Sequence, residues 1–311
     1  MGVGKVNSLA AASIAKINSL AKASIGKLNS IANAFVAAFT DDKAVSKSIS
    51  TGSGESISVS STTHFNFVQS DAFSIGFWIR VGWNNSLNTN IHFFAMNDGS
   101  TTARNQQIRI FYNESNNRLE FRMGSNNSNR SLQFWALHSN LTQTGLPGSS
   151  TSQYWSSASD ANRGNVNSDN FTHLMITKGT GTTLAASNIA AYWNGSKLGN
   201  AFYASGNNFG TVSMDASSAR RVCLGSNAHN FQKCGNNNET VYNDLTIHNT
   251  QLSDSEVAAL YNSGTPTDAT QLSTSGNLRG YYTFEASDGA DTSGTSGPTF
   301  TVSGDSNIES I

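Results

Sequence analysis

Residues 242–264, YNDLTIHNTQLSDSEVAALYNSG, combine a strand pattern with a helix pattern that follows it directly. The run YNDLTIHN predicts a β-strand. Ser253 then precedes Glu256 by three residues, which is the capping box of a helix N-terminus. We expect this helix to end near Asn262 to Gly264 and to bury Val257, Leu260 and Tyr261. The segment therefore predicts a strand that leads into one short helix.

Strand patterns dominate the chain on both sides of this segment. The run FSIGFWIRV alternates large apolar residues at 73, 75, 77, 79 and 81 with other residues, which predicts a strand with one strongly apolar face. SISVSS and HFNFVQ are shorter alternating runs, and WNGS predicts a hairpin turn with Gly195 at positive φ. Further strand patterns are IHFFAM, QIRIFY, RLEFRM, FTHLMITK, IAAYWNGSKLG, RRVCLGS and LRGYYTFE. Many short strands with aromatic residues and Gly/Asn turns predict a mainly β protein, a sandwich of two sheets.

Two stretches lack this patterning. Residues 41–55, rich in Ser and Gly, are interpreted as a linker, with the entry to a domain as the alternative. Residues 124–168 form a polar stretch longer than an ordinary connection, which indicates a functional or decorative loop.

Residues 1–40 contain three near-copies of an eleven-residue phrase, VNSLAAASIAK, INSLAKASIGK and LNSIANAFVAA. On a helix, an eleven-residue period aligns apolar side chains in one stripe. The predicted amphipathic arm needs a partner, because packing supplies most helical stability. That partner is expected to be another copy or a larger assembly, with docking on the chain's own sandwich as the alternative. The stripe comprises Val6, Leu9, Ile14, Ile17, Leu20, Ile25, Leu28 and Ile31.

Composition excludes several classes of partner. The 311 residues carry a net charge of −1, and 13% are charged, so no basic surface for nucleic acid is expected. Lysines interrupt the apolar residues of the arm, so we expect neither a signal peptide nor a membrane span. Cys223 and Cys234 could close a ten-residue loop or both be free.

The runs AFSIGFWIRV, FTHLMITK, IAAYWNGSKLG and RGYYTFE, together with residues 242–264, resemble the concanavalin A-like, laminin-G-like jelly-roll family of lectin and glucanase folds. The resemblance covers about residues 56–301 and implies a laminin-G-like jelly-roll sandwich over residues 56–311. The N-terminal phrase resembles the opening of virion-associated proteins of bacteriophages.

Together the two resemblances imply a phage virion structural protein, in the form of a decoration, fibre or tail component on the virion exterior. The arm would bind other virion proteins or further copies, and the sandwich would bind glycans on the host surface. The alternatives are a purely structural decoration or scaffold protein without a ligand, and a secreted, extracellular bacterial carbohydrate-binding module. The absence of a recognisable signal peptide disfavours the secreted module.

Catalysis is not expected. Glucanases of the resembled family carry paired carboxylates in a Glu-x-Asp-x-x-Glu motif, which this sequence lacks. Glu256 already has a capping role, and His173 is interpreted as a packing residue of a middle strand.

Glycan binding requires amides and carboxylates for sugar hydroxyls and a ring for the apolar face of the sugar. Residues of these types in loop-like surroundings are Trp83, Asn97, Asp98, Tyr154 and Trp155. Many laminin-G-like domains bind calcium through oxygen ligands, and Asp98 is the preferred single ligand here. Asp244 occupies an acidic position of the resembled family that could instead be structural.

Overall fold

The computed structural model describes parts of the chain between residues 41 and 310. These are residues 41–47, 56–61, 64–67, 70–81, 91–97, 106–113, 118–123, 132–137, 171–181, 188–198, 202–205, 220–227, 232–233, 240–285, 289–303 and 307–310. The predicted arm lies outside them.

The first sheet, sheet A, has eight antiparallel strands in the order β10-β9-β8-β3-β15-β1-β18, with β16 paired to β15. Its central strands β3 and β15 are both nine residues long, and β15 is buried along its whole length. The bounds are β1 Lys43–Lys47, β3 Phe73–Val81, β8 Thr172–Lys178, β9 Ile189–Trp193, β10 Ser196–Lys197, β15 Thr240–His248, β16 Leu278–Tyr282 and β18 Asn307–Ser310.

The second sheet, sheet B, also has eight antiparallel strands, in the order β11-β7-β6-β5-β4-β12-β2-β17. A separate two-stranded sheet pairs β13 with β14. The bounds are β2 Ser56–Ser61, β4 Ile91–Asn97, β5 Gln106–Asn113, β6 Arg118–Met123, β7 Leu132–Leu137, β11 Phe202–Ser205, β12 Arg220–Leu224, β13 Ser226–Asn227, β14 Gln232–Lys233 and β17 Thr301–Ser303.

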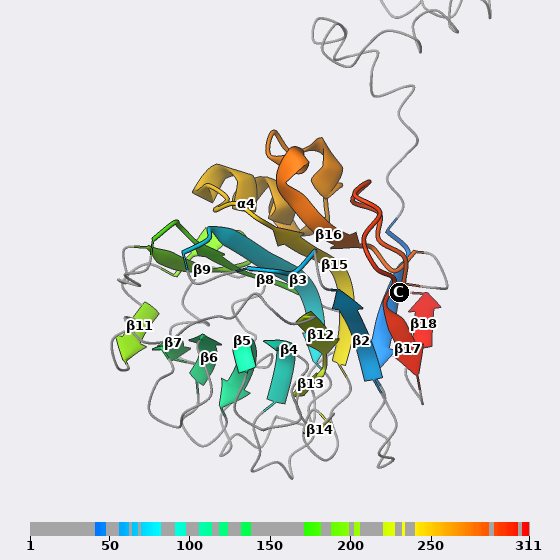
Figure 1. The fold of residues 1–311 in the computed structure, drawn as a ribbon, viewed down its shortest axis with the longest axis horizontal. Helices are drawn as coiled ribbons and strands as arrows, with labels where there is room; N and C mark the ends of the chain where they lie inside the picture. Colours follow the sequence, from blue (N-terminus) through cyan, green and yellow to red (C-terminus); the bar gives the residue numbers. More distant parts are fainter. Residues whose placement is uncertain are drawn as a thin grey trace, which may run out of the picture. The chain divides into compact units, whose positions relative to one another are not determined.

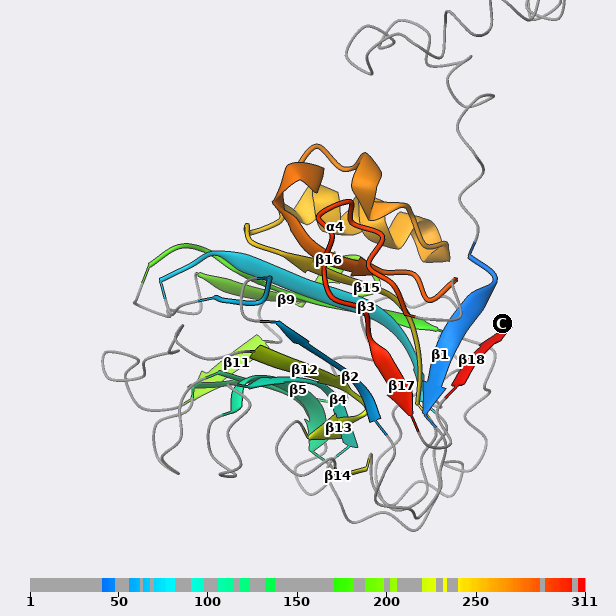
Figure 2. The ribbon, with the colours of Figure 1, turned by 45° about the vertical axis from the view of Figure 1, so that its right-hand side comes forward.

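The main core lies between the two sheets, which form two layers in Figures 1 and 2. The longer strands, such as β3 and β5, direct alternate side chains into this layer, as the period of two requires. Phe77 of β3 and Phe94 of β4 are both fully buried, and their rings stack across the layer with centroids 6.2 Å apart. The predicted mainly β architecture of two sheets is confirmed; the jelly-roll connectivity stays a prediction.

The helix α4, Asp254–Tyr261, packs with a second apolar cluster on the outer face of sheet A (Figure 2). Its predicted capping box is present: the Ser253 side chain accepts from the Glu256 N–H, and the Ser253 N–H donates to Glu256 Oε2 at 2.9 Å. Val257 and Leu260 are buried as expected, and Tyr261 is partly exposed. Three short 3₁₀ turns follow: η7 Asn262–Gly264, η8 Ala269–Gln271 and η9 Ser275–Asn277.

The hairpin turn predicted in WNGS is also confirmed. Asn194 and Gly195 both have positive φ, 48° and 73°, and connect β9 to β10. This is the backbone twist that two-residue hairpins prefer.

Three sequence predictions are corrected. Residues 43–47 of the predicted linker form β1, because Val45 pairs with Tyr242 and Ile308, partners far away in sequence. The polar stretch 124–168 contains β7, which pairs with β6. The alternating run HFNFVQ is a turn rather than a strand at residues 64–65.

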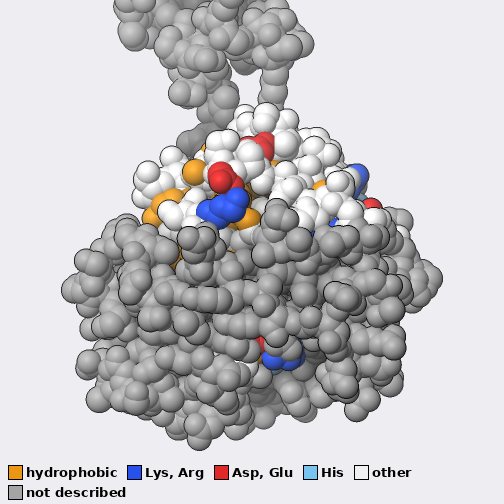
Figure 3. Space-filling model, turned by 90° about the vertical axis from the view of Figure 1, so that its left-hand side faces the viewer, with side chains coloured by type: hydrophobic (Ala, Val, Ile, Leu, Met, Phe, Trp, Pro, Cys, Tyr) orange, Lys and Arg blue, Asp and Glu red, His pale blue; other side chains and the backbone are white. Residues whose placement is uncertain are grey.

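No helix among the described residues is long and apolar enough to span a membrane. Charged side chains are sparse among those coloured in Figure 3 and gather in a few small spots. Cys223 of β12 is buried, and Cys234 lies outside the described residues, so whether the two cysteines pair stays open.

Candidate functional site

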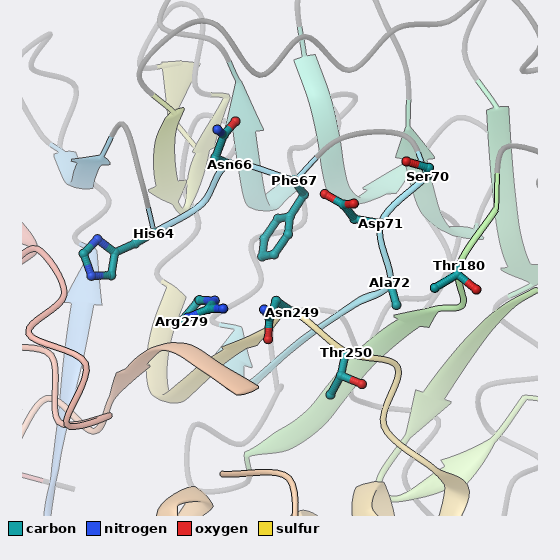
Figure 4. Close-up of a pocket in the computed structure, with 10 residues that line it drawn as sticks. All are labelled: His64, Asn66, Phe67, Ser70, Asp71, Ala72, Thr180, Asn249, Thr250 and Arg279. Carbon is teal, nitrogen blue, oxygen red and sulfur yellow. The ribbon is translucent and has the colours of Figure 1, made fainter. Parts of the chain in front are cut away.

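A polar hollow lies where β8 and β15 end, β3 begins and β16 begins (Figure 4). Its volume is about 720 Å³, within the range of roughly 300–1,000 Å³ that is typical of small-molecule sites. Hydrogen-bonding side chains dominate its lining. The residues are His64, Asn66, Phe67, Ser70, Asp71, Ala72, Thr180, Asn249, Thr250 and Arg279.

The connection between β2 and β3 forms one wall of the hollow. In HFNF, Phe65 and Phe67 are buried, and the Phe67 ring lies 5.6 Å from the ring of Phe73. The polar residues that alternate with them, His64 and Asn66, line the hollow. Asn66 Oδ1 is buried and has no hydrogen-bond partner among the described residues. This orphaned acceptor is costly for the free protein and is available to a donor on a ligand.

Lys178 holds the next part of this wall in place. It is fully buried at the end of β8, and its Nζ donates to the Asp71 carbonyl oxygen at 2.7 Å and to the Gly179 carbonyl oxygen at 2.9 Å. The Gly181 N–H donates to the Ser70 carbonyl oxygen at 2.9 Å. Burial lowers the pKa of Lys178 to about 8, against the opposing effect of the Asp71 charge. Lys178 therefore holds the backbone at Asp71 in place through these hydrogen bonds.

The opposite wall comes from the end of β15 and the start of β16. With its amide oxygen facing Arg279, Asn249 accepts from Arg279 Nε at 3.1 Å and donates to the Asn277 carbonyl oxygen at 2.9 Å. Ser74 Oγ donates to the Thr250 carbonyl oxygen at 2.8 Å, which fixes the backbone there. Arg279 is thus oriented by an amide, while Thr250 supplies a hydroxyl.

Chemically, the hollow combines an uncompensated amide oxygen, a carboxylate, hydroxyls and a guanidinium. Such a set can donate and accept several hydrogen bonds at once, which suits a ligand with many hydroxyl groups. The phenylalanine in the described lining, Phe67, is 3% exposed, so it supports the wall rather than offering a stacking surface.

Asp244 is engaged by neighbouring groups inside the protein. It sits at an irregularity of β15 with φ of 47°, is 5% exposed, and accepts from the Tyr281 hydroxyl at 2.8 Å. Burial and the neighbouring charge of Asp41 raise its pKa well above the ordinary value. No three acidic, His or Cys side chains among the described residues form a metal site.

His173 has the packing role predicted for it. It is 2% exposed, and its ring lies 5.2 Å from the ring of Trp78 and 6.3 Å from that of Tyr261. Burial lowers the pKa of His173 to about 3, so the ring is neutral at physiological pH. The glutamates Glu120, Glu256 and Glu285 are hydrogen-bonded to neighbouring protein groups.

Of the sequence-predicted binding residues, Asn97 alone lies in the described part of the chain, and it is not among the described residues that line the hollow. Asn97 ends β4 in sheet B, where it pairs with Arg221 of β12. The remaining predicted residues, Trp83, Asp98, Tyr154 and Trp155, lie outside the described part of the chain.

The residues of the hollow were missed for a physical reason. Asn66 stands in an alternating run that reads as a strand, and Asn249 and Thr250 directly follow a strand. One sequence signal could have indicated the hollow: the polar residues 248–250, HNT, end the strand pattern before the helix. Ends of neighbouring strands meet at one edge of a sheet, so polar residues there can lie close together.

Neither a family model nor a curated protein matches this chain. Among solved structures, a candidate carbohydrate-binding protein from Bacteroides ovatus is similar, with a TM-score of 0.49, 12% identity and coverage of 88% of this chain and 61% of its own. The binding domain of Paraclostridial Mosquitocidal Protein 1 has a TM-score of 0.43, 20% identity and coverage of 71% and 43%. The binding domain of botulinum neurotoxin DC in complex with SialylT has a TM-score of 0.38 and 18% identity, with coverage of 62% of this chain and 36% of its own.

The chain spans between 36% and 61% of the length of these three structures. At identities of 12–20%, the likeness concerns the fold.

Proposed function

We propose that this chain binds glycans, and that the hollow beside β15 and β16 is a binding site. One observation carries the proposal: a hollow of about 720 Å³ is lined by amide, hydroxyl, carboxylate and guanidinium groups, and the buried Asn66 Oδ1 there has no partner among the described residues. A sugar hydroxyl would satisfy that oxygen and recover the free energy that its burial costs.

The walls support selective binding, because they are held before a ligand arrives. Lys178 fixes the backbone at Asp71, and Asn249 orients Arg279. Preorganised polar groups lose little conformational entropy on binding. The apolar face of a sugar would need a ring, and Trp83, Tyr154 and Trp155 remain the proposed platforms.

We further propose that the protein is a virion component that displays this sandwich on the exterior of a bacteriophage. The support is the eleven-residue repeat of residues 1–40, whose apolar stripe needs a partner surface. In this view the arm attaches the chain to other virion proteins or to further copies.

A glycan array with the full chain tests the binding proposal. Asn66→Ala and Thr250→Ala each remove one polar group from the hollow and should weaken binding of any glycan found, by roughly tenfold for a hydrogen bond worth about 1.4 kcal/mol. Thr265→Ala is the matched control, since Thr265 is exposed and lies outside the hollow.

Unchanged binding in Asn66→Ala and Thr250→Ala, with correctly folded protein, would refute the hollow as the site. Loss of binding only on alanine substitution of Trp83 and Trp155 would place the site there. A chain that binds no glycan at all would favour the structural scaffold without a ligand.

The arm is tested separately by replacing Ile14, Ile17 and Leu20 with Asp. The charges would interrupt the stripe, so we expect loss of assembly with the sandwich still folded. The mass of the intact assembly is the measurement, and normal incorporation of the variant into particles would contradict the proposed attachment.

A further inference from the structure

The outer face of sheet B brings two arginines together. Arg109 of β5 pairs directly with Arg122 of β6, and Phe111 pairs with Glu120 in the next row. These side chains point away from the core because the residues that alternate with them in β5 belong to it, namely Ile108, Ile110 and Tyr112. In Figure 3, blue and red side chains occur together low on the molecule, the part that sheet B forms in Figure 1.

Glu120 compensates the charge of Arg122. Glu120 is fully buried, and its Oε2 accepts from Arg122 at 2.8 Å. Its other oxygen, Oε1, accepts from Asn113 Nδ2 at 2.6 Å. Both oxygens of this carboxylate are thus engaged by neighbours other than Arg109.

No carboxylate among the described residues forms an ion pair with Arg109; its anionic neighbour Glu120 is already bonded to Arg122 and Asn113. Its guanidinium lies over the Phe111 ring, 4.2 Å from the centroid, and its buried Nε has no hydrogen-bond partner in the described part of the chain. Burial and the nearby charge of Arg122 lower the pKa of Arg109 to about 10, partly offset by Glu120. At neutral pH the group is therefore a charged, largely desolvated cation.

We propose that Arg109 anchors a second binding site, separate from the hollow, for the carboxylate of an acidic sugar. A guanidinium presents two parallel N–H groups that match the two oxygens of a carboxylate. The Phe111 ring holds the guanidinium plane in position, so few rotamers are lost on binding.

The charge balance favours one carboxylate over a polyanion. Two guanidinium groups face one carboxylate here, which leaves a single uncompensated positive charge among the described side chains of this cluster. Acidic peptides and nucleic acids need several cations in a row. That the carboxylate belongs to a sugar rests on the glycan-binding function proposed above.

The test uses the full chain and two monosaccharides that differ by one carboxylate, glucuronic acid and glucose. Titration calorimetry should show tighter binding of glucuronic acid, and Arg109→Gln should weaken that binding roughly tenfold or more while leaving glucose binding unchanged. Arg80→Gln is the matched control, since the Arg80 guanidinium also lies over a phenylalanine ring, 5.4 Å from the centroid of Phe171 in the other half of the sandwich. Arg109→Lys keeps the positive charge but lacks the two parallel N–H groups of the guanidinium, so it should bind glucuronic acid with intermediate affinity.

Equal binding of glucuronic acid by the wild type and Arg109→Gln, with the same thermal midpoint, would overturn the inference. So would equal affinities of the wild type for glucuronic acid and glucose. A peptide of glutamates that binds more tightly than glucuronic acid, and does so through Arg109, would reject the sugar in favour of a protein partner. Loss of neutral-glycan binding in the hollow variants is measured independently, so either proposal can fail alone.

Discussion

Gly195 offers a quantitative test of how the β9–β10 hairpin packs against α4. Gly195 has φ of 73°, and a Cβ built there would lie 2.7 Å from Cδ1 and 2.8 Å from Cβ of Tyr261. Tyr261 cannot yield freely, because its ring stacks on that of Trp78 with centroids 5.6 Å apart. Gly195→Ala therefore combines a backbone penalty with a steric one.

The magnitude follows from these two contributions. Placing an L-residue in the left-handed region costs about 1–2 kcal/mol, and overpacking a filled site costs about 1–3 kcal/mol. We expect Gly195→Ala to lower the free energy of unfolding by about 2–5 kcal/mol. Gly294 has φ of 79° with nothing within 4 Å of a built Cβ, so Gly294→Ala isolates the backbone contribution.

Urea unfolding followed by circular dichroism measures both variants against the wild type. The difference between Gly195→Ala and Gly294→Ala should be about 1–3 kcal/mol. Adding Tyr261→Gly to Gly195→Ala removes the ring and the Cβ that the new methyl group would meet, so it should remove most of this difference, as a double-mutant cycle detects. Equal losses in the two glycine variants would refute the close packing of the hairpin on Tyr261.

Three further predictions concern charged and capping groups. Ser253→Ala should lower the free energy of unfolding by about 1 kcal/mol, because it removes the helix cap. Burial raises the pKa of Glu256, but hydrogen bonding from Ser253 holds this pKa below 4.5, so Glu256 stabilises the fold above that pH and the contribution is lost as pH falls through the folded pKa. The variant should show less of this loss in urea unfolding between pH 3 and 6. Asp244 has a raised pKa from burial and from Asp41, so its contribution is present below 3.8 and lost as pH rises; Asp244→Asn, which imitates the neutral acid, should gain stability relative to the wild type between pH 4 and 8, and parallel stability profiles would contradict this. Lys178→Met should weaken glycan binding in the array although Lys178 does not line the hollow, because the substitution removes the hydrogen bonds that hold the backbone of that wall. Unchanged affinity would show that the wall keeps its conformation without Lys178.

The local elements of the fold were predictable because their signals lie within a few residues. The capping box at Ser253 and the Asn194–Gly195 turn each depend on neighbours in the sequence, and both were predicted correctly. Strand β1 depends instead on Val45 meeting Tyr242 and Ile308. A five-residue run in a polar stretch gives no sign of such distant partners.

The residues of the proposed site were harder to predict for the same reason. Loop aromatics attract attention in a sequence because a ring in polar surroundings is unusual, whereas Asn66 and Asn249 are ordinary residues in a chain rich in Asn, Ser and Thr. Their significance comes from being brought to the two sides of one hollow. The charge imbalance at Arg109 is equally invisible, because it depends on which oxygens of Glu120 are already occupied.

The positions of the two proposed sites follow from which faces of the two sheets are covered. Helix α4 and the segment after it cover the outer face of sheet A, where Met175, Tyr192 and Tyr281 are buried beneath them. On the proposed function, a ligand would meet sheet A at the ends of its strands, where the hollow lies. Sheet B instead presents Arg109 and Arg122, both partly exposed, on the face opposite the core. A neutral sugar unit at the strand ends and an acidic unit on sheet B would thus contact different parts of one fold, and a glycan carrying both could gain affinity from each only if its length spans the two sites.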